Sequence, residues 1–166
     1  MVNQAAGNDV EKPDYVLALE KAYGPPNQEG FGGAVFFEQV EEDSDLEELA
    51  RKYYQYFVGG KWEEWGEETW MFSWKEVYAR KSGELQDIVK EVAGIDDVAA
   101  SSSVPLLTEI IEDPDAAKKA LAGAYDDPQV ADLRMFTIGD GEAMSGLLVA
   151  GQRENGEATF LVVLMD

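Results

Sequence analysis

Carboxylates are the most numerous side chains available for chemistry in this sequence. The chain of 166 residues contains 34 Asp and Glu but no histidine and no cysteine. Without imidazole or thiolate groups, Ser-His-Asp and Cys-His nucleophile sites, the usual zinc sites, iron–sulfur clusters and His- or Cys-ligated haem are excluded. Any reaction would depend on carboxylates, Tyr, Lys, Ser or Thr, and we expect no bound cofactor and no metal.

One chemistry open to this composition is glycoside hydrolysis, in which one acid protonates the leaving group and another acts as base or nucleophile. Acid pairs arise by chance in a chain this acidic, and no spacing marks one pair as buried. The glycine-rich stretches 30–33 and 139–141 lack the context and the lysine of a phosphate-binding loop. We interpret both as turns and expect no enzymatic activity.

Aromatic residues are the densest feature, with ten of them between residues 53 and 78. A helix stripe and a strand face buried in the core would account for most of these rings. The others are candidates for a binding surface, because exposed aromatic rings anchor protein partners, and flat rings beside acids also suit a sugar or a cation. The predicted aromatic site consists of Tyr54, Tyr56, Trp62, Glu63 and Trp65.

A second candidate is the acidic stretch 38–48, in which seven of eleven residues are Asp or Glu. The residue order of an EF-hand is absent, and the dipole of a helix attracts acids to its first turn. We therefore interpret the stretch first as a solvated helix start, with a docking patch as the alternative. The predicted docking residues are Glu41, Glu42, Asp43 and Asp45.

Net charge limits the choice of partner. The 34 acids and 13 Lys and Arg give a net charge of −21, a field that repels nucleic-acid backbones. One interpretation of this charge is that it keeps the protein soluble or adapts it to a salty cytoplasm. The other is that it forms a surface that meets a basic partner. No stretch approaches the ~20 apolar residues of a membrane span, and the N-terminus lacks the pattern of a secretion signal. We expect a cytoplasmic protein that binds neither nucleic acid nor a membrane.

The elements that must position these residues form an α+β fold, with a C-terminal antiparallel β-meander in a four- to five-stranded sheet and helices packed against it. Three apolar segments end the chain, and Asn155-Gly156 predicts a two-residue turn with positive φ at both positions. Residues 160–165 are continuously apolar, which is typical of a central strand covered on both faces. We expect one domain over residues 13–166 after a flexible tail of residues 1–12.

Four helices, a short apolar strand at residues 34–37 and one aromatic strand are predicted before the meander. Asp14 and Ser44 are expected to cap the first two helices, which end at Gly24 and Val58, and Ser82 and Asp113 to begin the later two. The buried stripe of the second helix would consist of Leu46, Leu49, Ala50, Tyr53 and Phe57. A strand over residues 69–78 would bury Trp70, Phe72, Trp74 and Tyr78 on one face.

Two short segments resemble known families. Residues 49–54, followed by Gly60-Lys61-Trp62, are similar to the helix-then-Trp opening of the nuclear-transport-factor-2-like fold, but the helices expected after Tyr78 depart from that fold, whose later part is nearly all strand. Residues 127–152 are similar to the closing hairpin of small acidic nuclease-inhibitor and immunity proteins. The second similarity covers no functional motif, so neither assigns the chain to a family.

The sequence favours a non-enzymatic module that binds a protein partner with a basic surface, such as an inhibitor or an immunity-like factor, because opposite charges raise association rates. The alternative is a small ligand- or sugar-binding domain, including a carboxylate-dependent one, that uses the Trp-rich segment. An apolar cleft holding two carboxylates beside Trp62 or Trp65 would favour the ligand. An exposed, convex acidic face would favour the protein partner.

Overall fold

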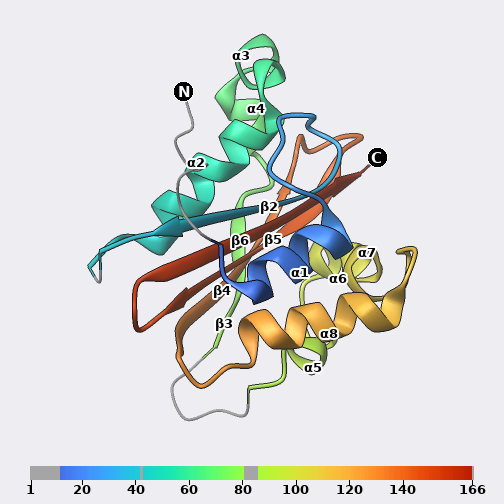
Figure 1. Cartoon of the computed structure of the whole chain (residues 1–166). Helices are drawn as coiled ribbons and strands as arrows, with labels where there is room; N and C mark the ends of the chain where they lie inside the picture. Colours follow the sequence, from blue (N-terminus) through green and yellow to red (C-terminus); the bar gives the residue numbers. More distant parts are fainter. Residues whose placement is uncertain (1–11, 42, 81–85, 166) are drawn as a thin grey trace.

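A five-stranded antiparallel sheet forms the centre of the computed structural model (Figure 1). The structure describes residues 12–41, 43–80 and 86–165, so the predicted tail lies almost wholly outside the described residues. The predicted α+β class and the C-terminal meander are confirmed. The strands, in the sheet order β2-β6-β5-β4-β3, are β2 (Gly32–Gln39), β6 (Glu157–Met165), β5 (Ser145–Arg153), β4 (Val130–Gly139) and β3 (Lys75–Ala79).

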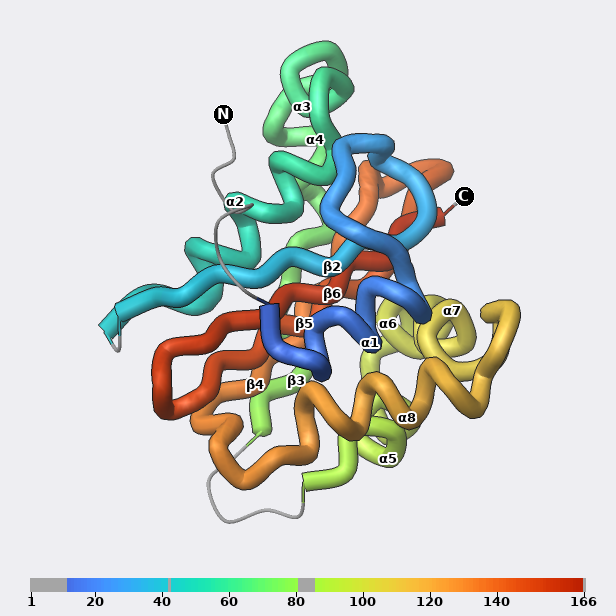
Figure 2. Tube along the Cα trace, in the orientation of Figure 1, coloured from blue at the N-terminus to red at the C-terminus, as the bar shows by residue number. Residues whose placement is uncertain are grey.

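Helices cover both faces of this sheet (Figure 2). Leu147 and Leu161 pack against one layer, whereas Leu148 and Phe160 pack against the other. Successive side chains of a strand point to opposite faces, so the central strands need both layers, which explains the continuous apolar run at 160–164. The first layer consists of α1 (Asp14–Tyr23), α5 (Ile88–Ala93), α6 (Val98–Ser103), α7 (Pro105–Thr108) and α8 (Pro114–Tyr125). The second consists of α2 (Leu46–Val58), α3 (Gly60–Trp65) and α4 (Glu67–Met71).

The caps of the first two helices differ from the prediction. The N-cap of α1 is Pro13, so Asp14 lies in the first turn, where its charge is favourable to the helix dipole, and forms no cap hydrogen bond. The N-cap of α2 is Asp45, whose Oδ1 accepts from the backbone N of Glu47 at 3.0 Å. The predicted capping box that starts at Ser44 is therefore wrong by one residue.

The later helices agree better with the sequence. Helix α8 begins after its cap Asp113 and ends at Tyr125, as predicted. Helix α5 is capped by Asp87 and ends before Gly94. The predicted cap of this helix, Ser82, lies outside the described residues, but Gln86 and Asp87 are described and precede the helix, so the predicted start is too early.

The aromatic strand predicted over residues 69–78 is wrong in its first half. Helix α4 occupies this part of the chain, and strand pairing begins only at Lys75. Trp70 is buried from α4, whereas Phe72, directly after the helix, is 78% exposed. The alternating aromatic residues therefore do not indicate a strand in this segment, because the geometry of helix α4 determines where their side chains point.

The second half of that segment also departs from a single buried face. A register shift between Glu76 and Tyr78 interrupts the pairing of β3 with β4. Such a bulge adds one residue to a strand and reverses the alternation beyond it. As a result, Trp74 packs against the layer of α2, and Tyr78 packs against the layer of α5 and α8.

The hairpin between β5 and β6 has three loop residues, 154–156, rather than the predicted two. The backbone N of Gly156 donates to Arg153 O at 2.9 Å. Of these three loop residues, only Gly156 has a positive φ, of 90°, so the predicted positive φ at Asn155 is wrong. This geometry is that of a three-residue hairpin loop that ends in a glycine bulge.

Replacing Gly156 by alanine should destabilise the fold by about 1 kcal/mol or more, because alanine is strained at this φ. A Cβ would also lie 2.5 Å from Val40 O. Gly123→Ala is the matched control, since the Cβ position of this α8 glycine is open and alanine should stabilise the helix by up to ~1 kcal/mol. Urea unfolding measures both effects. Equal stability of the two variants would contradict the hairpin geometry.

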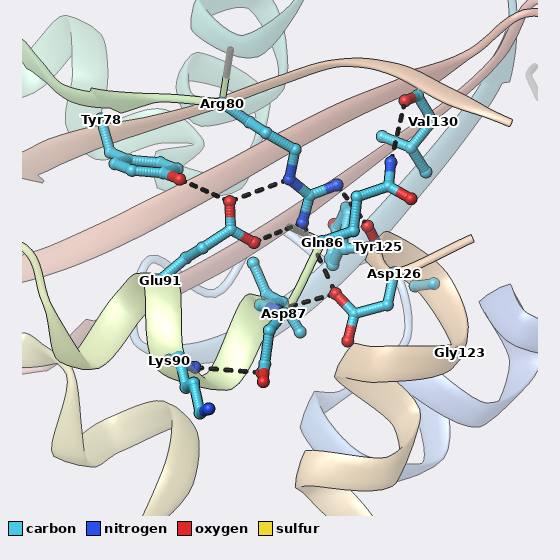
Figure 3. A network of polar contacts seen from close by, with 12 residues as sticks. Tyr78, Arg80, Gln86, Asp87, Lys90, Glu91, Gly123, Tyr125, Asp126 and Val130 are labelled. Atoms are coloured by element: carbon cyan, nitrogen blue, oxygen red, sulfur yellow. Dashed lines mark hydrogen bonds and ion pairs between the residues drawn. The ribbon is translucent and has the colours of Figure 1, made fainter. Parts of the chain in front are cut away.

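A buried ion pair joins the end of β3 to α5 and α8 (Figure 3). The side chains of Arg80 and Glu91 are 5% and 9% exposed. Arg80 Nε donates to Glu91 Oε2 at 2.8 Å, Arg80 Nη1 donates to Tyr125 O at 2.6 Å, and the hydroxyl of Tyr78 donates to Glu91. Burial raises the pKa of Glu91, but the hydrogen bonds from Arg80 and Tyr78 outweigh burial and hold that pKa below its usual value.

Arg80→Met should cost about 3–5 kcal/mol near neutral pH, because it leaves the Glu91 carboxylate buried without its cation. A carboxylate whose pKa is lowered on folding stabilises fully above its unfolded pKa of about 4.3, and this stabilisation is lost as the pH falls through the folded value. The cost should therefore shrink in acid. The control is Arg134→Met. Arg134 forms an ion pair with Asp132 in which both side chains are 37% exposed, so this substitution should cost at most about 1 kcal/mol. A cost at Arg80 that does not change with pH would refute this account.

Candidate binding groove

An open groove of about 670 Å³ lies between the α3–α4 segment and the loop that joins β4 to β5. Two walls from distant parts of the sequence form it. The first wall consists of Trp65, Glu68, Thr69 and Phe72, and the second of Asp140, Gly141, Glu142 and Ala143. Aromatic rings and carboxylates therefore meet in one depression of the surface.

The exposed aromatic surface of the groove belongs to Trp65 and Phe72. Trp65 is 46% exposed and stacks on the buried Trp70 with ring centroids 5.3 Å apart and an interplanar angle of 1°. One face of the Trp65 ring is therefore covered, and the opposite face is the one that a ligand could contact. The Phe72 ring lies over Gly141, where a Cβ would come within 2.5 Å of it, so this contact requires glycine.

A sharp turn at Gly66 makes the stacking possible. Gly66 separates α3 from α4 and has a φ of 91°, a conformation that favours glycine. The hydroxyl of Thr69 donates to Trp65 O at 2.8 Å across this turn. Trp70 Nε1 donates to Lys61 O at 2.9 Å, which fixes the ring that supports Trp65.

The carboxylates of the groove have two different roles. Asp140 is buried, and its Oδ1 accepts from the backbone N of Glu142 at 2.8 Å and of Met144 at 2.9 Å, so it shapes the loop. Glu68 and Glu142 are exposed, and neither forms an ion pair within the described part of the chain. Two carboxylates are thus free to meet a cation beside the rings.

The hydroxyl of Tyr54 holds the two walls together. It donates to Trp70 O in α4 at 2.7 Å and accepts from the backbone N of Gly139 at the end of β4 at 3.1 Å. Burial raises the pKa of Tyr54, so the hydroxyl stays protonated and can donate. Tyr54 is therefore a positioning residue for the groove.

Only Trp65 of the predicted aromatic site lines the groove. The predicted exposure of Tyr54 and Trp62 is wrong: both are buried and pack edge to face at 5.3 Å. Tyr56 is 48% exposed but packs against Phe36. Glu63 is exposed on α3 and does not line the groove. The stripe of α2 differs from the prediction, because its buried residues are Leu46, Ala50, Tyr54, Phe57 and Val58.

The predicted docking patch lies at the other end of α2 (Figure 1). Glu41, Asp43 and Asp45 are exposed, while Glu42 lies outside the described residues. The 13 residues of α2 separate this patch from α3, which is about 20 Å at 1.5 Å per residue. The structure does not bring the two predicted sets together.

Most residues of the groove were not predicted, although one signal was present. Glu68 and Phe72 are four residues apart, the spacing that places side chains on one helical face. The period of two in the neighbouring aromatic residues favoured a strand instead. Residues 140–143 carry no local signal, because their role arises only when the loop packs beside α4.

A second groove, of about 740 Å³, lies between α1 and α8. Small alanine side chains form much of its lining. Its charged residues carry both signs, with Lys21 and Lys119 beside Glu112 and Asp113. It therefore shows no charge preference that would identify a partner.

Comparison of the chain with protein-family models, with curated proteins and with solved structures finds no match in any of the three. The two resemblances of the sequence thus gain no support. Within residues 12–41, 43–80 and 86–165, no helix is both long and apolar enough to cross a membrane. The same residues contain no cluster of three or more acidic side chains arranged to hold a metal ion.

Tyr54→Phe should destabilise the protein by about 1–3 kcal/mol, because the buried backbone groups of Trp70 and Gly139 lose their partner. It should also shift the NMR signals of residues 140–144 as the walls loosen. Tyr56→Phe, on the same helix, is the control, since the Tyr56 hydroxyl forms no hydrogen bond within the described residues. Similar unfolding curves for both variants would show that Tyr54 does not join the walls.

Proposed function

We propose that the chain is a non-enzymatic binding module that engages a basic protein partner through the groove between α3–α4 and the β4–β5 loop. The observation that carries this proposal is the meeting of exposed Trp65 and Phe72 rings with the exposed carboxylates of Glu68 and Glu142, which form no ion pair with any residue that the structure describes. Partly exposed aromatic rings supply anchor energy, and a ring face beside a carboxylate attracts a cation. An inhibitor or an immunity-like factor in the cytoplasm is a role of this kind.

The acidic patch at the start of α2 assists the encounter in this proposal. Glu41 and Asp43 are exposed there, in a chain with a net charge of −21. The 13 residues of α2, about 20 Å of helix, separate the patch from α3, and this length exceeds the screening length of about 8 Å at physiological salt. The patch therefore acts on association at low salt, whereas the groove determines how long the complex lasts.

The same groove supports a second candidate function, the binding of a sugar or another small ligand. This alternative requires an apolar cleft with two carboxylates beside Trp62 or Trp65. The groove has Glu68 and Glu142 beside Trp65, but it is open to solvent rather than an enclosed apolar cleft, so the protein partner is proposed first. A sugar ring could stack on the open face of Trp65 and donate hydrogen bonds to the carboxylates. Because a neutral ligand carries no charge, its binding would be insensitive to salt, unlike that of a basic partner.

The test uses a short flexible peptide with equal numbers of Arg and Lys, separated by Gly and Ser, as the basic probe. Its affinity should fall as ionic strength rises from about 10 to 150 mM, because the screening length shrinks from about 30 to 8 Å. Stability should rise over the same range, since screening relieves self-repulsion. Adaptation to salt alone predicts the stability gain without any salt-sensitive binding.

Trp65→Ala should weaken peptide binding by about 1 kcal/mol, roughly fivefold, if the ring is a cation anchor. The control is Tyr56→Ser, which removes a ring of similar exposure outside the groove and should leave the affinity unchanged. A folded Trp65→Ala variant with wild-type affinity would contradict the proposal. Salt-independent binding of a neutral sugar that is lost in this variant would support the alternative.

A further inference from the structure

We infer that the group the groove accepts from its partner is the guanidinium of an arginine, in preference to the ammonium of a lysine. This inference rests on the proposed function and specifies its chemistry. It follows from three features of the groove, which are a fixed planar surface, two free carboxylates and an opening to solvent.

The planar surface is the open face of Trp65. The parallel ring of Trp70 supports it from behind, and Trp70 is itself held by its hydrogen bond to Lys61 O. A rigid indole face suits a flat group, because a guanidinium stacks on it over its whole plane. An ammonium group is compact and gains only the charge component of that contact.

The carboxylates lie on both walls of the groove. Glu68 comes from α4 and Glu142 from the β4–β5 loop, and neither is paired with a cation in the described part of the chain. A guanidinium stacked on an indole still has its N–H groups directed outward in its own plane, where carboxylates accept them in pairs. One arginine can therefore use the ring and a carboxylate at once.

The openness of the groove adds to this preference. Trp65 and Phe72 are 46% and 78% exposed, so a bound cation keeps contact with water. A guanidinium stacked on the ring keeps its in-plane N–H groups hydrated in such an open site, whereas a strongly hydrated ammonium must give up water to touch the ring face. The open site thus favours arginine.

The experiment compares two peptides that are identical except that all basic residues are Arg in one and Lys in the other. The wild-type chain should bind the Arg peptide at least about threefold more tightly at low salt. Trp65→Leu should remove that difference while leaving weak, salt-sensitive binding of both peptides. Ring-current shifts of the arginine Cδ protons, present with wild type and absent with Trp65→Leu, report the stacking directly.

Matched variants separate the ring from the charges. The double variant Glu68→Gln with Glu142→Gln should weaken both peptides, whereas Glu63→Gln, an exposed acid outside the groove, should change neither by more than about twofold. If Trp65→Leu does not fold, the ring-current shifts of the arginine Cδ protons in the wild-type complex test the stacking without a variant, and their absence would contradict it.

Three results would overturn the inference. Equal affinity of the wild-type chain for both peptides, with both weakened by Trp65→Leu, would leave the proposed function standing and remove the arginine preference. An arginine preference that survives in Trp65→Leu would place its origin elsewhere on the surface. If no groove variant changes the binding of either peptide, the proposed function fails together with the inference.

Discussion

Burial of β5 and β6 on both faces is the constraint on which the rest of this structure depends. Residues 146–153 of β5 and 158–164 of β6 are buried throughout, so each face of the sheet needs its own apolar layer. The second layer consists of three consecutive helices, α2 to α4. Its last helix reaches the end of β4, where Tyr54 bonds to Gly139, and the groove forms at that junction.

The most regular parts of the fold could be predicted from the sequence. The meander and α8 carry long periodic patterns or strong cap signals, and both were predicted correctly. The structure of residues 69–78 was predicted wrongly, because an aromatic residue by itself indicates neither a strand nor a buried face. Phe72 was assigned to the core and is 78% exposed, while Tyr54 was assigned to the surface and is buried. The groove needs two segments some 70 residues apart, and no local pattern links them.

Negative charge predominates because 34 Asp and Glu outnumber 13 Lys and Arg, and two of these cations are used inside the fold. Arg80 is used inside the fold, where it pairs with Glu91. Arg153 is also largely buried, and its Nη2 donates to Gly123 O and Ala124 O at the end of α8, while its guanidinium lies 3.8 Å from the ring centre of Tyr15. Cations used in this way do not screen the surface acids. The acids that remain, among them Glu68 and Glu142, are available to a partner.

The most direct test of the binding groove follows the indole N–H signals of the four tryptophans while a mixed Arg and Lys peptide is added. The tryptophans differ in exposure, since Trp62 and Trp70 are buried and Trp65 is 46% exposed. The largest shifts should occur at Trp65 and at the backbone amides of residues 140–143. Largest shifts at the exposed acids near the start of α2, with Trp65 unchanged, would contradict the account.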